Sequence, residues 1–260
     1  MKKAILVVSF GTSFNNTREK TIDVIESDLR RAFPDREFYR AWTSKIITNK
    51  LKERDGCCID MPQEALERMK KDGVTDVLVQ PTFIIPGLEF EYLKEKVTGY
   101  EKDFDSIKMG RPLVGSGDDA AEVAGIIARD IRTDDDEALV LMGHGVFNGN
   151  NGVYLELEKE IHDLGYERAF IGTVEAEPGL EHVLKSVKRH GTKKVLLAPL
   201  LIVSGDHANN DMAGESDDSW ASAFRREGFE VRCLLKGLGE YEEIRKMFAA
   251  HARAPYTKGE

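Results

Sequence analysis

The sequence alternates between short apolar runs and longer segments in which apolar residues recur every three or four positions. The short runs are rich in β-branched residues and predict strands, and the longer segments predict helices. The strands are expected at residues 4–9, 37–42, 76–85, 107–114, 138–143, 169–174, 194–203 and 229–235. Strands that alternate with helices are typical of a parallel sheet covered by helices.

Local signals place some of the helix ends. The first helix is expected at about residues 17–33, where Asn16 and Glu19 fit a capping box and the apolar residues from Ile22 onward share one face. Another helix is expected to begin near Pro62 and to end at Gly73, because proline suits the first helical turn and glycine the C-terminal cap.

The two halves of the chain resemble each other. The segment VLVQPTFIIPG (77–87) aligns without gaps with VLLAPLLIVSG (195–205), and Gly11 in VVSFGTS corresponds to Gly145 in VLMGHGV. The polar stretch RTDDDE (132–137) lies between the halves. We therefore expect an α/β fold of two similar Rossmann-like lobes, residues 1–136 and 137–260, each with a four-stranded parallel sheet and flanking helices. The lobes should face each other across a cleft, and the last helix could pack back on the N-terminal lobe.

Composition narrows the classes of function. The 37 Lys and Arg residues against 46 Asp and Glu residues give a formal net charge of -9, and no basic tract is present, so we expect no nucleic-acid partner. No apolar run approaches the roughly 18 to 20 residues of a membrane span, and the apolar N-terminal stretch is better explained as a first strand than as a signal peptide. We expect a cytoplasmic protein with no membrane partner. The oligomeric state stays open, with a homo-oligomer among the alternatives.

Three polar residues follow successive predicted strands of the second half. His144 follows the first of these strands, Glu175 the second and His207 the third. Ligands of open parallel sheets bind beyond the carboxyl ends of the strands, so all three side chains should open onto one crevice. Imidazole and carboxylate groups bind divalent first-row ions, and three protein ligands leave coordination positions open for a substrate. The sequence predicts a metal site in which His144 and Glu175 are also catalytic, because histidine exchanges protons near neutral pH.

Neighbouring groups leave alternatives open. Glu177 is a rival carboxylate for this site, although a place at the N-terminus of the next helix explains it better. Asp206 and Asp211 could each orient the His207 imidazole or serve only the loop. The glycines on both sides of His144 indicate either a tight turn or the close approach of a large flat ligand.

The first half should form the opposite wall and hold an organic substrate. In the internal alignment Phe10 takes the place of His144 and Glu89 that of His207, so most metal ligands are lost there. Phe10 and Trp42 could equally be core residues. The substrate-binding candidates offer backbone amides, hydroxyls, an aromatic ring and a carboxylate: Ser9, Phe10, Gly11, Thr12 and Glu89.

Four motifs together resemble those of a known family. VVSFGTS near the start, LMGHG at His144, VEAEP at Glu175 and GDHANNDMAGESDDSW around His207 are similar to the anaerobic sirohydrochlorin cobaltochelatases, class II chelatases of cobalamin synthesis. The resemblance covers nearly the whole chain. It implies that Co(II), the substrate metal, enters the reduced tetrapyrrole sirohydrochlorin with release of two protons and no nucleotide cofactor. The family's metal ligands correspond to His144, Glu175 and His207, and its proton acceptor to His144.

Other functions stay open at this point. A non-catalytic two-lobed protein that binds a tetrapyrrole or a metal is one alternative, and a siroheme-type ferrochelatase is another. The choice among Co(II), Fe(II) and Ni(II) cannot be made from ligand types alone, because metal supply is as decisive. Sirohydrochlorin carries eight carboxylates, so cationic partners are needed, for which strand-end residues are candidates: Arg40, Lys45, Arg54 and Arg111.

Overall fold

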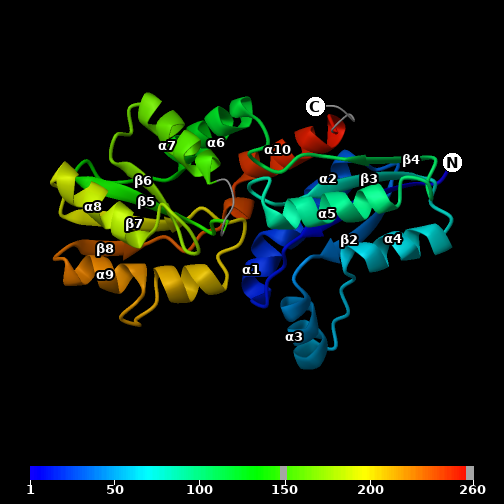
Figure 1. Cartoon of the computed structure of the whole chain (residues 1–260), viewed down its shortest axis with the longest axis horizontal. Helices are drawn as coiled ribbons and strands as arrows, with labels where there is room; N and C mark the ends of the chain where they lie inside the picture. Colours follow the sequence, from blue (N-terminus) through cyan, green and yellow to red (C-terminus); the bar gives the residue numbers. More distant parts are fainter. Residues whose placement is uncertain (147–150, 256–260) are drawn as a thin grey trace. The chain divides into compact units, whose positions relative to one another are not determined.

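A computed structural model describes residues 1–146 and 151–255. The chain forms two compact units, Met1–Gly115 with Gly239–Glu260, and Ser116–Leu238. Each unit holds one four-stranded, fully parallel sheet, with strand order β2-β1-β3-β4 in the first and β6-β5-β7-β8 in the second (Figure 1). The predicted α/β class, with two similar parallel sheets and flanking helices, is confirmed.

The elements alternate along the chain as the apolar pattern predicts. Those of the first unit are β1 (Lys3–Ser9), α1 (Asn15–Lys20), α2 (Ile22–Ala32), β2 (Glu37–Trp42), α3 (Lys45–Asp55), α4 (Pro62–Lys71), β3 (Asp76–Pro81), α5 (Leu88–Gly99), β4 (Ser106–Met109) and, after the second unit, η2 (Leu238–Glu240) and α10 (Glu242–Arg253). Those of the second unit are α6 (Gly117–Asp130), β5 (Glu137–Gly143), α7 (Gly152–Asp163), β6 (Ala169–Thr173), α8 (Leu180–His190), β7 (Lys194–Pro199), η1 (Ala208–Met212), α9 (Trp220–Arg226) and β8 (Glu230–Cys233).

Two strands end earlier than the apolar runs predict. The run at 76–85 forms a strand only to Pro81, and the run at 194–203 only to Pro199. Proline has no backbone N–H and cannot continue the hydrogen-bond ladder of a central strand. The apolar residues beyond each proline lie in loops, where Phe83 and Leu200 are nevertheless buried.

The first helix differs from its prediction. The chain forms α1 and α2 with a break at Thr21, whose hydroxyl donates a hydrogen bond back to the carbonyl of Thr17 at 2.6 Å. Such a local bond competes with the regular helical ladder. The expected capping box of Asn16 and Glu19 is wrong, because Phe14 is the N-cap residue and makes no side-chain cap bond. The apolar face of α2 is buried as predicted.

Helices cover both faces of the sheet in the second unit. Val183 of α8 and Phe224 of α9 pack against Val140 and Leu197 on one face, and α6 and α7 lie on the other (Figure 1). Because α6 packs with α7, the compact units divide near residue 116, earlier than the expected domain boundary at 136. In the first unit, α10 packs on α2 and β3. Within the described residues, every helix is too short or too polar to cross a membrane.

Candidate metal centre

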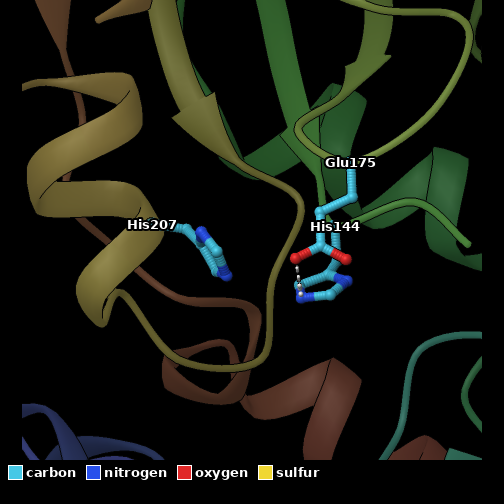
Figure 2. A group of neighbouring side chains, drawn as sticks. All are labelled: His144, Glu175 and His207. Carbon is cyan, nitrogen blue, oxygen red and sulfur yellow. Dashed lines mark ion pairs between the residues drawn. The ribbon is translucent and has the colours of Figure 1, made fainter. Parts of the chain in front are cut away.

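Three loops of the second unit carry polar side chains to one edge of its sheet. β5 lies between β6 and β7, and His144 directly follows β5. Glu175 lies two residues beyond the end of β6, and His207 lies in the loop after β7, immediately before η1. The carboxyl ends of parallel strands share one edge, and a crevice opens where the strand order reverses, here beside β5. Figure 2 shows the three side chains directed toward the same space.

The distances within this His–Glu–His cluster (His144, Glu175 and His207) suit one ion. Nε2 of His144 lies 3.7 Å from Oε1 of Glu175, and the two imidazole centroids are 4.9 Å apart. One potential ligand atom from each residue lies within 4.8 Å of the others, and no second group of this kind occurs among the described residues. In a tetrahedral site with bonds of about 2.1 Å, ligand atoms lie about 3.4 Å apart. Side-chain rotations that bring these atoms up to about 1.4 Å closer together would therefore complete the site.

Each imidazole of the cluster uses Nδ1 within the protein. Nδ1 of His144 lies 3.1 Å from the carbonyl oxygen of Gly145, and Nδ1 of His207 lies 2.6 Å from Oδ2 of Asp211. Both acceptors require a hydrogen on Nδ1, so Nε2 of the neutral ring keeps the lone pair that a metal needs. The side chains of His144, Glu175 and His207 are 35%, 49% and 33% exposed, which leaves them accessible to an ion.

Backbone hydrogen bonds hold two of these loops together. The N–H of Val174 donates to the carbonyl of Gly143, and the N–H of Glu175 donates to the carbonyl of His144, both at 3.0 Å. The Thr173 hydroxyl donates to the carbonyl of Ala176 at 2.6 Å and tightens the turn around Glu175. The position of the Glu175 backbone is therefore tied directly to that of His144.

Close packing explains both glycines beside His144. A Cβ at Gly143 would lie 2.5 Å from Cε1 of Tyr154. Gly145 has φ +86°, and a Cβ there would lie 2.7 Å from Oγ1 of Thr173. At Gly145, both the left-handed backbone conformation and the lack of space for a Cβ require glycine. The tight turn thus explains Gly145, whereas Gly143 leaves room for the Tyr154 ring; the approach of a large flat ligand stays a prediction.

The first unit repeats this turn without the metal ligands. Gly11 has φ +105°, and a Cβ there would lie 2.5 Å from Cε3 of Trp42. Trp42 is fully buried, so of the two readings open for it the core residue is correct. Phe10, which aligns with His144, is 42% exposed and is not a core residue.

The other substrate-binding candidates lie in different surroundings. Ser9 and Thr12 are buried, the Ser9 hydroxyl accepting a hydrogen bond from that of Thr82 and the Thr12 hydroxyl from the N–H of Phe14. Glu89 lies in the first turn of α5 and is partly exposed. Both hydroxyls therefore have partners within the protein. The substrate-binding roles of all five candidates stay predictions.

The rival acidic residues separate by their hydrogen bonds. Oε2 of Glu177 accepts from the N–H of Gly179 at 2.9 Å, which places it at the N-terminus of α8. Oδ1 of Asp206 accepts from Nδ2 of Asn210 at 3.0 Å, whereas Asp211 contacts the His207 imidazole. The sequence left the choice between Asp206 and Asp211 open because both stand close to His207.

Two cationic candidates are occupied by acidic neighbours in their own unit. Nε of Arg40 donates to both carboxylate oxygens of Glu26, at 2.7 and 2.9 Å, and the guanidinium also reaches Asp23 at 2.5 Å. Glu26 is buried, and burial raises its pKa above the usual range. Arg54 binds the adjacent Asp55 with two hydrogen bonds. Arg40 and Arg54 therefore have structural partners that a substrate carboxylate would have to displace.

Comparisons with known proteins match the chain over nearly its whole length. A model of the family described as cobalt chelatase (CbiK) matches residues 3–256. The chain is 39% identical to a sirohydrochlorin cobaltochelatase of Salmonella typhimurium over 96% of this chain and 95% of that protein. It is 33% identical to the sirohydrochlorin cobaltochelatase CbiKC of Nitratidesulfovibrio vulgaris over 97% and 90%. The fold is similar to that of SirB from Bacillus subtilis with Fe3+, with a TM-score of 0.66, 13% identity, and coverage of 97% of this chain and 95% of that one.

Proposed function

Because the chain belongs to the cobalt chelatase (CbiK) family, we propose that it inserts Co(II) into sirohydrochlorin and that the His–Glu–His cluster holds the incoming ion. The reaction exchanges two pyrrole N–H protons of the ring for one Co(II) ion, so charge and atoms balance without a nucleotide. The convergence of three ligand atoms within 4.8 Å, from loops after three adjacent strands, is the observation that carries the site assignment.

The cluster is suited to a metal that must be passed on. Three protein ligands leave coordination positions open, through which ring nitrogens can reach the ion before the protein releases it. The ligand side chains are a third to a half exposed, so the site is not a closed structural centre. A site of this kind binds the substrate metal reversibly.

His144 has a second role as acceptor of a ring proton. Its Nδ1 is engaged by the Gly145 carbonyl, so the lone pair on Nε2 is the one available, first to the ion and then to a proton. Glu175 lies 3.7 Å from this nitrogen and stabilises the imidazolium that forms. The roles of ligand and base fall in succession on the same nitrogen, because the metal must leave before the proton arrives.

Anaerobic insertion kinetics test this function. The full chain is incubated with sirohydrochlorin and Co(II), and the absorption of the ring is followed through many equivalents of product. Replacing His144 by alanine should abolish turnover, whereas His182→Ala, at an exposed position on α8 of the same unit, should retain it. A folded, active His144→Ala protein contradicts the assignment. A single stoichiometric spectral change without turnover supports the alternative of a non-catalytic binder.

The physiological metal and the partners form the finer part of the proposal. Co(II) is favoured because both curated relatives described above are named cobaltochelatases, while Fe(II) insertion is the alternative. Comparative insertion rates for Co(II), Fe(II) and Ni(II) distinguish them. A cytoplasmic location and the lack of nucleic-acid and membrane partners stay predictions from the sequence, and the oligomeric state stays open, with a homo-oligomer among the alternatives.

A further inference from the structure

The hydrogen bond between His207 and Asp211 gives one ligand of the cluster a charged acceptor. Nδ1 of His207 and Oδ2 of Asp211 are 2.6 Å apart, the distance of a strong, charge-assisted bond. Nδ1 of His144 instead lies 3.1 Å from the neutral carbonyl oxygen of Gly145. A carboxylate acceptor fixes the tautomer and orientation of an imidazole and strengthens it as a metal donor more than a carbonyl does.

An unusual turn places the two side chains together. Residues Ala208–Met212 form a π-helical turn, closed by a hydrogen bond from the N–H of Ala213 to the carbonyl of Ala208 at 3.2 Å. His207 stands at the start of the turn and Asp211 four residues on, so both lie on one side of it. Single π turns occur frequently at functional sites.

Contacts other than the Asp211 carboxylate hold this turn. Nδ2 of Asn209 donates to the carbonyls of Ser204 and Gly205, at 3.1 and 2.7 Å. A Cβ at Gly214 would lie 2.2 Å from the carbonyl oxygen of Asn210, so the chain leaves the turn at a position that only glycine can occupy. Removing the Asp211 carboxylate should therefore change the partner of the imidazole and leave the turn in place.

We propose that Asp211 is a positioning residue for metal insertion: it holds His207 in the Nδ1–H form, with Nε2 directed at the ion, and strengthens His207 as a metal ligand. His207 then holds the ion in place while it is offered to the ring. This inference rests on the proposed function for the identity of the ion.

Asp206 provides a matched control. It carries the same charge, is adjacent to His207 in the sequence, and accepts a hydrogen bond from Asn210. Asp206→Ala and Asp211→Ala thus remove equal charge near the cluster, but only the second removes the acceptor of the His207 imidazole. Asp211→Asn removes the charge and keeps an oxygen that can accept from Nδ1–H.

The test combines histidine NMR with Co(II) titration of the full chain. With ring-¹⁵N-labelled histidine and His207→Ala for assignment, wild type and Asp206→Ala should show His207 as the Nδ1–H tautomer, and Asp211→Ala should gain the Nε2–H form. The dissociation constant for Co(II), from its d–d absorption, should rise by about 10- to 100-fold in Asp211→Ala. It should rise less in Asp211→Asn, and stay near the wild-type value in Asp206→Ala.

Three results would overturn the proposal. The first is a wild-type His207 with its hydrogen on Nε2, which is observed in the wild-type protein once His207→Ala has assigned the signal. The second is equal weakening of Co(II) binding in Asp206→Ala, Asp211→Asn and Asp211→Ala, which would show that the lost negative charge alone, and not the hydrogen bond to His207, weakens binding. The third is a folded Asp211→Ala protein with unchanged tautomer and affinity. Failure of the proposed function looks different: Co(II) binding responds to Asp211, yet no metal enters sirohydrochlorin.

Discussion

Replacing Gly145 by alanine should damage both the stability of the second unit and its metal site. Gly145 has φ +86°, and the added Cβ would lie 2.7 Å from Oγ1 and 2.8 Å from Cβ of Thr173, and 3.1 Å from Cβ of Ala176. The left-handed conformation costs an alanine about 1–2 kcal/mol. Overpacking typically costs a further 1–3 kcal/mol or so. The free energy of unfolding should therefore fall by about 2–5 kcal/mol.

Gly165 is the matched control for this substitution. It has φ +91°, but no described atom lies within 4 Å of a Cβ built there. Gly165→Ala should thus lose only the conformational part, about 1–2 kcal/mol. Urea denaturation of wild type and both variants measures the difference. Because the crowded atoms belong to the last residue of β6 and to the loop that carries Glu175, Gly145→Ala should also weaken Co(II) binding, whereas Gly165→Ala should not. Equal destabilisation by the two variants, with unchanged Co(II) affinity, would refute the packing argument.

Three further predictions concern the ion and the buried carboxylates of Glu26 and Glu137. Co(II) at a hundred times its dissociation constant should raise the free energy of unfolding by about 2.7 kcal/mol, and alanine at His144 should remove this gain; denaturation with and without a chelator measures both. Burial raises the folded-state pKa of Glu26 above the unfolded value of 4.5, so the stabilising contribution of Glu26 is greatest below pH 4.5 and is lost as pH rises through the folded pKa. The stability of the wild type relative to Glu26→Gln should therefore increase as pH falls from neutral toward 4.5. Parallel pH profiles of the two proteins would contradict this. Arg232→Leu should destabilise the second unit by about 1–3 kcal/mol, because it leaves the buried Glu137 carboxylate without its guanidinium partner, and a urea midpoint equal to that of wild type would argue against this.

The sequence alone predicts the strands well because their residues are buried on both faces of the sheet. Short apolar runs such as AILVVS and ALVLMG predict buried strands, and both form central strands of their sheets. The predicted strand ends are wrong where apolar residues stay buried beyond the last hydrogen bond of the sheet, as at Phe83 and Leu200, which are buried but lie outside the strands. The break between α1 and α2 was missed because the apolar spacing carries no signal of it; a single local hydrogen bond, from the Thr21 hydroxyl to the Thr17 carbonyl, accompanies the break.

The position of the His–Glu–His cluster could be predicted because it follows from topology. Residues at the carboxyl ends of neighbouring parallel strands must meet, whatever their side chains do. The choice of Asp211 over Asp206 could not be predicted, because it depends on a π turn that no pattern of apolar residues indicates. The reason for the two glycines beside His144 also needed coordinates, since Tyr154 and Thr173 come from other elements.

The most direct test of the metal site is anomalous diffraction at the cobalt edge from crystals of the protein soaked in Co(II). We expect one strong peak about 2.0–2.2 Å from a nitrogen of His144, a nitrogen of His207 and a carboxylate oxygen of Glu175. The peak should vanish in His207→Ala crystals. A cobalt peak at a different place in the wild-type protein, with these three side chains left without an ion, would contradict the assignment of the site.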